Sequence, residues 1–153
     1  MKKAIHLKGW SFLSINLTGS IENMKNVKVD VIIPVYKPDK KFEILLKRLQ
    51  EQECRPNRII VMNTEEKYWM KEWEKCPFLE VHHLEKKDFD HGGTRKKAAT
   101  LSDADIMVFM TQDALPADKS LITNLIQPFS GNENIGASYA RQLPLPDCSY
   151  LER

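Results

Sequence analysis

Cysteine is scarce in this chain of 153 residues, and no apolar segment is long. The three cysteines are odd in number, far apart and without a CxxC pair, which argues against a disulfide framework and favours a reducing compartment. No apolar run approaches the ~20 residues that cross a bilayer. We therefore expect a cytoplasmic protein, with any membrane contact peripheral and at the inner face of the membrane.

A large charge excess and three common functional motifs are also absent. Lysine and arginine number 23 against 21 aspartates and glutamates, and a formal charge of +2 gives no drive toward nucleic acid or an anionic membrane. The chain has no G-x-G-x-x-G, G-x-x-x-x-G-K-[ST] or G-x-S-x-G segment. A dinucleotide fingerprint, a P-loop and a serine-hydrolase nucleophile elbow are therefore disfavoured, and no nucleic-acid partner is expected.

The chain does contain a regular alternation of strand and helix patterns from Val27 onward. Apolar and β-branched runs predict strands at residues 29–35, 58–62, 78–84, 105–110 and 134–139. Apolar residues at helical spacing predict helices after Asp39, at 68–73, at 94–101 and around 121–129. This alternation is typical of a parallel α/β sheet with right-handed crossovers. We assign residues 27–153 to this fold and residues 1–26 to an N-terminal extension.

A glycine pair gives the strongest local signal at a predicted strand end, where ligands of such sheets bind. Gly92-Gly93 before a helix lets the backbone approach a ligand closely, and the N–H groups of a helix start favour an anion. Arg95 adds a fork of donors suited to phosphate oxygens. The alternative is a tight loop in which the two glycines only supply positive φ.

A single carboxylate after the strand at 105–110 gives the second signal. Asp113 stands in the segment Met110–Pro116, where it could hold a divalent cation that also bridges a diphosphate. Mg²⁺ and Mn²⁺ prefer oxygen ligands and keep several waters, so one protein carboxylate can suffice. The alternative is a turn cap leading into Pro116.

Three segments in this order, Val31–Tyr36, Gly92–Arg95 and Thr111–Ala114, resemble family 2 glycosyltransferases with the GT-A fold. Together with Phe89 and Arg141–Pro144 they resemble its rhamnosyltransferase-like branch. The resemblance implies a Rossmann-like GT-A domain that binds a nucleotide sugar in a mostly parallel sheet flanked by helices. It also implies an inverting transfer of a sugar, with rhamnose as a candidate, from a nucleoside diphosphate to a saccharide or lipid-linked acceptor. The expected pathway is cell-surface polysaccharide synthesis.

Residue roles follow from the same resemblance. Pro34 and Tyr36 match the loop beside the base and ribose, Arg95 faces the diphosphate, and Asp113 binds Mn²⁺ or Mg²⁺ although Thr111 replaces the first carboxylate of Asp-x-Asp. Asn63-Thr64-Glu65 stands where the family usually has an acidic residue that accepts the N3–H of uracil or thymine, a role that the amide oxygen of Asn63 can also fill. The expected donor-binding residues are Pro34, Tyr36, Asn63, Glu65, Gly92, Gly93, Arg95, Gln112 and Asp113, and the expected acceptor-side residues are Arg141 and Gln142.

A general base cannot be assigned, because the family places it in a second half that is not in this sequence. We therefore expect a C-terminally truncated domain that exposes apolar surface and self-associates. A non-catalytic remnant that folds and at most binds nucleotide is the main alternative. An unrelated nucleotide-binding or interaction domain remains a third reading, since Rossmann-like layouts serve many functions.

Overall fold

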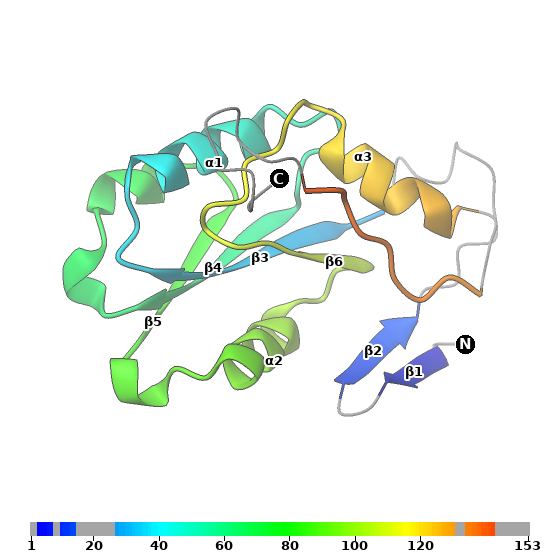
Figure 1. Cartoon of the computed structure of the whole chain (residues 1–153), viewed down its shortest axis with the longest axis horizontal. Coiled ribbons are helices and arrows are strands. Elements are labelled where there is room, and N and C mark those ends of the chain that lie inside the picture. The colour runs from blue at the N-terminus through cyan, green and yellow to red at the C-terminus, as the bar shows by residue number, and fades with distance from the viewer. Residues whose placement is uncertain (1–2, 8–9, 15–26, 131–133, 143–153) are drawn as a thin grey trace, which may run out of the picture.

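The computed structural model describes residues 3–7, 10–14, 27–130 and 134–142 of the chain. Its centre is a four-stranded parallel sheet in the order β5-β4-β3-β6 (Figure 1). The strands are β3 (Val29–Tyr36), β4 (Arg58–Thr64), β5 (Leu79–Leu84) and β6 (Ile106–Phe109). A separate antiparallel pair is formed by β1 (Lys3–Leu7) and β2 (Trp10–Ser14). The α/β fold that the alternation predicts is confirmed.

Helices cover both faces of this sheet, as Figure 1 shows. They are α1 (Lys40–Gln50), α2 (His91–Leu101), α3 (Leu121–Ile126) and the short 3₁₀ segments η2 (Glu66–Tyr68), η3 (Lys71–Lys75), η4 (Lys86–Asp88) and η5 (Gln127–Phe129). Asp39 caps α1 by accepting from the Lys41 N–H at 2.8 Å, as the sequence predicts. The apolar stripe of α1, Phe42 to Leu49, packs on one face of the sheet together with α3 and η3, while α2 lies on the other.

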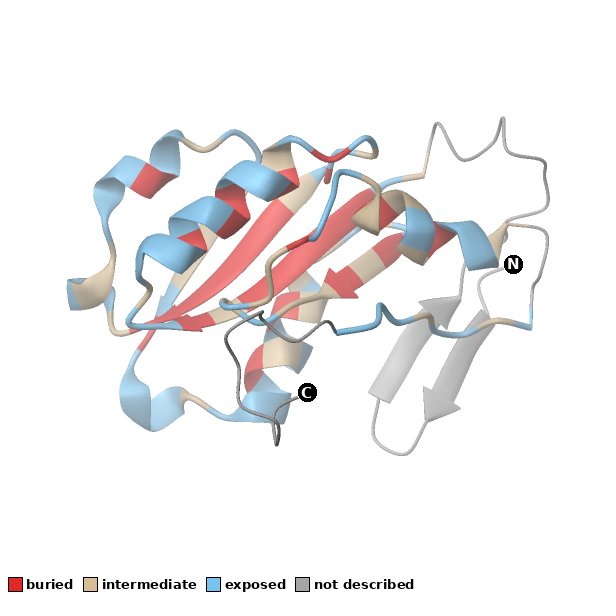
Figure 2. Cartoon of the chain, turned by 45° about the horizontal axis from the view of Figure 1, so that its top comes forward, coloured by how far each residue is buried: buried red, intermediate tan, exposed pale blue. Residues whose placement is uncertain are grey.

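The core lies on the two central strands, β3 and β4, which are buried on both faces (Figure 2). Alternate residues of β3 point to opposite faces, so Val31 and Ile33 contact the α1 side and Ile32 contacts the α2 side. The continuous β-branched run in the sequence has this physical origin, because neither face is left to solvent.

Three predicted elements differ from the structure. Residues 134–139 form no strand, and Ser138 instead bonds through its hydroxyl to the Leu125 carbonyl at 2.6 Å. Gly136, Ala137 and Ser138 offer little apolar surface for a sheet to bury, which leaves this segment without the packing that stabilises a strand. The helix predicted at 94–101 begins at His91, one turn earlier.

The helix predicted at 68–73 is wrong, because Trp69 and Met70 are extended and separate η2 from η3. Tertiary packing decides this region. Trp73 is buried, with its ring 5.2 Å from Phe42 of α1 and 5.1 Å from Trp69 in edge-on geometry. Met70, which the helical spacing places beside the two tryptophans, is 47% exposed. Trp73 is a core residue, and Trp69 is a partly buried side chain packed against the core.

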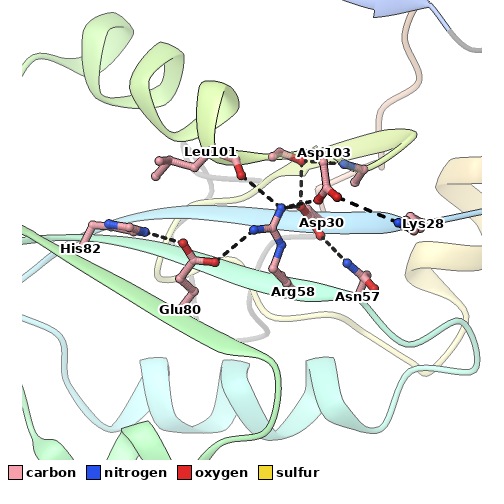
Figure 3. A network of polar contacts seen from close by, with 10 residues as sticks. Lys28, Asp30, Asn57, Arg58, Glu80, His82, Leu101 and Asp103 are labelled. Atoms are coloured by element: carbon pink, nitrogen blue, oxygen red, sulfur yellow. Dashed lines mark hydrogen bonds and ion pairs between the residues drawn. The ribbon is translucent and has the colours of Figure 1, made fainter.

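A polar network joins the amino-terminal ends of the strands (Figure 3). Asp30 is fully buried and accepts hydrogen bonds from Arg58 at 2.9 Å and from the Ser102 hydroxyl at 2.7 Å. The same guanidinium reaches Asp103 at 2.7 Å and Glu80 at 3.2 Å. A buried carboxylate is tolerated when charge and hydrogen bonds compensate it. This network therefore ties β3, β4 and β5 together at the edge opposite the predicted ligand site.

Candidate donor site at the carboxyl ends of the strands

The strand order reverses between β3 and β6, and we use the name crevice for the region outside the carboxyl ends of these two strands. Along the chain, β4 and β5 are added on one side of β3, and β6 then returns to its other side. In open α/β sheets such a reversal separates the loops that follow the two strands on either side of it, and ligands bind there. The segments that follow are Tyr36–Asp39 after β3 and Met110–Asp113 after β6. They overlap Val31–Tyr36 and Thr111–Ala114, two of the three segments that carry the family resemblance.

Tyr36 and Gln112 are held together across this crevice. The Tyr36 N–H donates to Oε1 of Gln112 at 2.7 Å, and Nε2 of Gln112 donates to the Tyr36 carbonyl at 3.1 Å. Both polar ends of the Gln112 amide are thereby engaged with backbone. Asp113 follows directly, is exposed, and lies in a turn that the Ala114 N–H closes on the Thr111 carbonyl at 3.2 Å.

A tyrosine–lysine cluster, defined by Tyr36, Lys37, Lys67, Tyr68 and Lys86, lies at the same edge. The two tyrosine rings meet edge-on at 6.0 Å, and Lys37 Nζ is 5.2 Å from one ring centroid and 5.0 Å from the other. Lys67 lies 4.9 Å from the Tyr68 ring and Lys86 lies 5.9 Å from the Tyr36 ring. Aromatic faces and ammonium groups together suit a ligand that carries both a planar ring and negative charge.

The two polar residues predicted after β4 have different surroundings. Asn63 is fully buried: its amide nitrogen lies 2.9 Å from Nδ1 of His83, and its Oδ1 has no partner among the described residues. Glu65 adopts φ 65° and accepts from Lys67 at 2.8 Å. This hydrogen bond holds the pKa of the Glu65 carboxyl below its usual value. The Glu65 carboxyl also has Tyr36 and Lys86 as neighbours, whereas the Asn63 amide lies beside His83.

The glycine pair forms the first turn of α2 and does not form a loop before it. Neither Gly92 nor Gly93 has the positive φ that the loop alternative requires. Asp90 is the N-cap, and its carboxylate accepts the Gly93 N–H. Gly93 is needed for this cap, because a Cβ there would lie 2.8 Å from Oδ2 of Asp90, whereas a Cβ on Gly92 would lie at 3.7 Å. Arg95 folds back on the same turn and donates to the His91 carbonyl at 3.1 Å.

This difference makes a matched pair of variants informative. Gly92→Ala is expected to be more stable than Gly93→Ala by about 1 kcal/mol, because both gain helix propensity but only the second displaces the N-cap carboxylate. Urea unfolding of the two proteins measures the difference directly. Equal midpoints would contradict the capping role of Asp90.

The two residues predicted for the acceptor side lie apart from the crevice. Arg141 and Gln142 are exposed in a segment without regular structure, where Arg141 lies beside the start of α3. The described residues contain no group of three or more His, Cys, Asp or Glu side chains that could hold a metal ion. Within the same residues, no helix is long and apolar enough to cross a membrane.

Comparison with known proteins agrees with this geometry. A family model described as "Glycosyl transferase family 2" matches residues 30–148, which include β4, β5, β6, all of β3 except Val29, and both crevice loops. The chain belongs to glycosyl transferase family 2. The resemblance seen in the sequence is thereby confirmed.

Two curated relatives of this chain are O-antigen chain rhamnosyltransferases. The chain is 35% identical over 132 residues to O-antigen chain rhamnosyltransferase RfbN of Salmonella typhimurium, covering 82% of this chain and 40% of the relative. It is 29% identical over 103 residues to O-antigen chain rhamnosyltransferase WbaN of Salmonella anatum, covering 67% and 32%. The chain therefore spans less than half the length of either relative.

Solved structures of S. aureus TarS have a similar fold. TarS 1–349 superposes with a TM-score of 0.53 at 21% identity, covering 63% of this chain and 30% of TarS 1–349. Its complex with UDP-GlcNAc gives a TM-score of 0.51 at 20% identity, with 63% and 29% covered. At this identity the similarity establishes the GT-A fold alone.

Four side chains of the tyrosine–lysine cluster were missed by the motif analysis: Lys37, Lys67, Tyr68 and Lys86. The sequence pattern assigns Lys86 to a solvated face and Tyr68 to a helix. A signal was present, because each lysine follows the end of a predicted strand by two to five residues, and parallel strands end at one edge of the sheet.

Proposed function

We propose that this chain binds the nucleoside-diphosphate sugar donor of an inverting glycosyltransferase that acts in cell-surface polysaccharide synthesis. The donor sugar is rhamnose or a related deoxy-sugar, and the acceptor is a saccharide or a lipid-linked saccharide. The observation that carries the proposal is that Glu65 after β4 and the Gln112–Asp113 turn after β6 both adjoin Tyr36 at the carboxyl end of β3. The rhamnosyltransferase relatives support the choice of sugar.

The base would lie against Tyr36, with Glu65 as the acceptor for its N3–H. Because Lys67 lowers the pKa of Glu65, the carboxylate stays charged as the pH falls through the usual range of a glutamate. A charged acceptor makes a stronger hydrogen bond than the amide of Asn63 would. Base recognition through Glu65 is therefore expected to persist at mildly acidic pH.

The diphosphate would lie between the start of α2 and Asp113. Arg95 would supply positive charge there, and the N–H groups of α2 that Asp90 does not cap would supply donors. The chemistry of Asp113, a single exposed carboxylate, fits Mg²⁺ or Mn²⁺ when the donor and water provide the other oxygen ligands. Such an ion would stabilise charge on the departing diphosphate. With one protein carboxylate, we expect the metal and the diphosphate to bind together.

Calorimetric titration with UDP and with dTDP, each in the presence of Mn²⁺ or EDTA, tests this proposal. We expect binding that requires Mn²⁺ and is tighter for dTDP, the base expected for a rhamnose donor. An absent preference for dTDP would remove the rhamnose assignment. No binding of either nucleotide to a folded sample would favour the non-catalytic remnant.

A further inference from the structure

The ladder of backbone hydrogen bonds between β3 and β6 ends before strand β3 itself ends. The last backbone bond runs from the Met110 N–H to the Ile32 carbonyl at 3.0 Å, while β3 continues to Tyr36. Backbone groups of alternate residues point to the same side of a strand, so Ile32, Pro34 and Tyr36 all face β6. Pro34 has no N–H to donate, and the two strands separate at this position.

Beyond the end of this ladder, the side chain of Gln112 forms one further pair of hydrogen bonds with β3. A primary amide carries the same donor and acceptor as a peptide group, and here it pairs with both the N–H and the carbonyl of Tyr36. Among the described residues, these are the polar contacts that join the loop after β3 to the Thr111–Asp113 turn. The chain turns away immediately afterwards, since Lys37 adopts φ 47°.

We propose that Gln112 is a positioning residue that couples base recognition at Tyr36 to metal recognition at Asp113. It does this by fixing the end of β3 to the turn after β6, since Oε1 and Nε2 of its amide each form a hydrogen bond with the Tyr36 backbone. The inference rests on the proposed donor-binding function. It assigns to Gln112 a role different from the donor contact that the motif implies.

The expected size of the coupling follows from the cost of ordering a loop. With the bridge in place, a base held by Tyr36 presents its diphosphate to a carboxylate that is already in position. Without the bridge, each binding event must order the Thr111–Asp113 turn. Two hydrogen bonds of ordinary net strength correspond to about a tenfold change in a dissociation constant, and a change of this size lies within the usual range of coupling between sites.

The test compares Gln112→Met with the control Gln127→Met, an exposed glutamine of η5. For each protein we would measure the dissociation constants of the preferred nucleoside diphosphate and of its nucleoside, with Mn²⁺ and with EDTA. In Gln112→Met, the factor by which Mn²⁺ strengthens diphosphate binding should fall about tenfold. Binding of the nucleoside should change less than about twofold, and Gln127→Met should behave as the wild type. Thermal melting establishes that each variant folds.

A second comparison separates coupling from general damage. In the background of Asp113→Asn, the Gln112→Met change should have no further effect on diphosphate binding, because no metal recognition is left to couple. Equal losses in both backgrounds, or equal losses for nucleoside and diphosphate, would overturn the inference. Metal-dependent binding that is unchanged in Gln112→Met would overturn it while the proposed function stands. Absent binding by the wild type would instead reject the proposed function.

Discussion

Asp113→Asn is expected to abolish the Mn²⁺ dependence of nucleoside-diphosphate binding and to weaken that binding about a hundredfold in the presence of the metal. Asp113 is the carboxylate of the crevice turn, and it is exposed directly after the Gln112 bridge. The asparagine keeps the size of the side chain but removes the charge that a hard cation prefers. Calorimetric titration of both proteins with and without Mn²⁺ measures the effect.

Glu53→Gln is a matched control for this change, because it removes one exposed carboxylate in the segment that follows α1. Its affinity should equal that of the wild type. The unfolding midpoint of Asp113→Asn should also be close to that of the wild type, since an exposed turn residue contributes little to stability. Metal-dependent binding that survives in Asp113→Asn would place the metal elsewhere and would remove the assigned role of this residue.

Arg58→Met is expected to lower the free energy of unfolding by about 3–5 kcal/mol. The substitution leaves Asp30 fully buried without its charged partner, and only the Ser102 hydroxyl and the more distant Asn57 amide, at 3.4 Å, remain as donors. The loss is large because an uncompensated buried charge costs more than the ion pair contributed. Urea unfolding of the variant measures it.

Two further variants test that explanation. Lys28→Met removes an exposed pair with Asp103 at 3.9 Å and should change the free energy of unfolding by less than about 0.5 kcal/mol. The double variant Asp30→Leu with Arg58→Met removes the buried carboxylate together with its partly exposed partner and should recover much of the lost stability. A double variant as unstable as Arg58→Met would mean that packing around the guanidinium, and not the unpaired charge, accounts for the loss.

The parts of the fold that depend on local pattern could be predicted from the sequence. The β-branched run at 29–35 is β3 with one more residue, and Asp39 caps α1. Periodicity failed where long-range packing competes with it. Trp69 and Trp73 pack on Phe42 from α1, and this contact divides the expected helix in two.

For the candidate site, too, some features could be predicted from the sequence and others could not. The segments that reach it were predictable, because the carboxyl ends of parallel strands lie at one edge of a sheet. The surroundings of single side chains were not. The motif assigns Asn63 and Gln112 to ligand contact, but the first is buried beside His83 and the second is bonded to Tyr36. Both outcomes depend on partners that are distant in the sequence.

The sequence by itself therefore determined the parallel α/β architecture, the family and the loops that form the crevice, since these follow from hydrophobic runs, strand ends and short motifs. Only the tertiary structure decided which side chains face the crevice and which ones hold it together. The physical reason is that the role of an amide, a carboxylate or a lysine depends on the group that it contacts, and that group can be distant in the sequence. For Gln112 that partner is the backbone of Tyr36, 76 positions earlier in the chain.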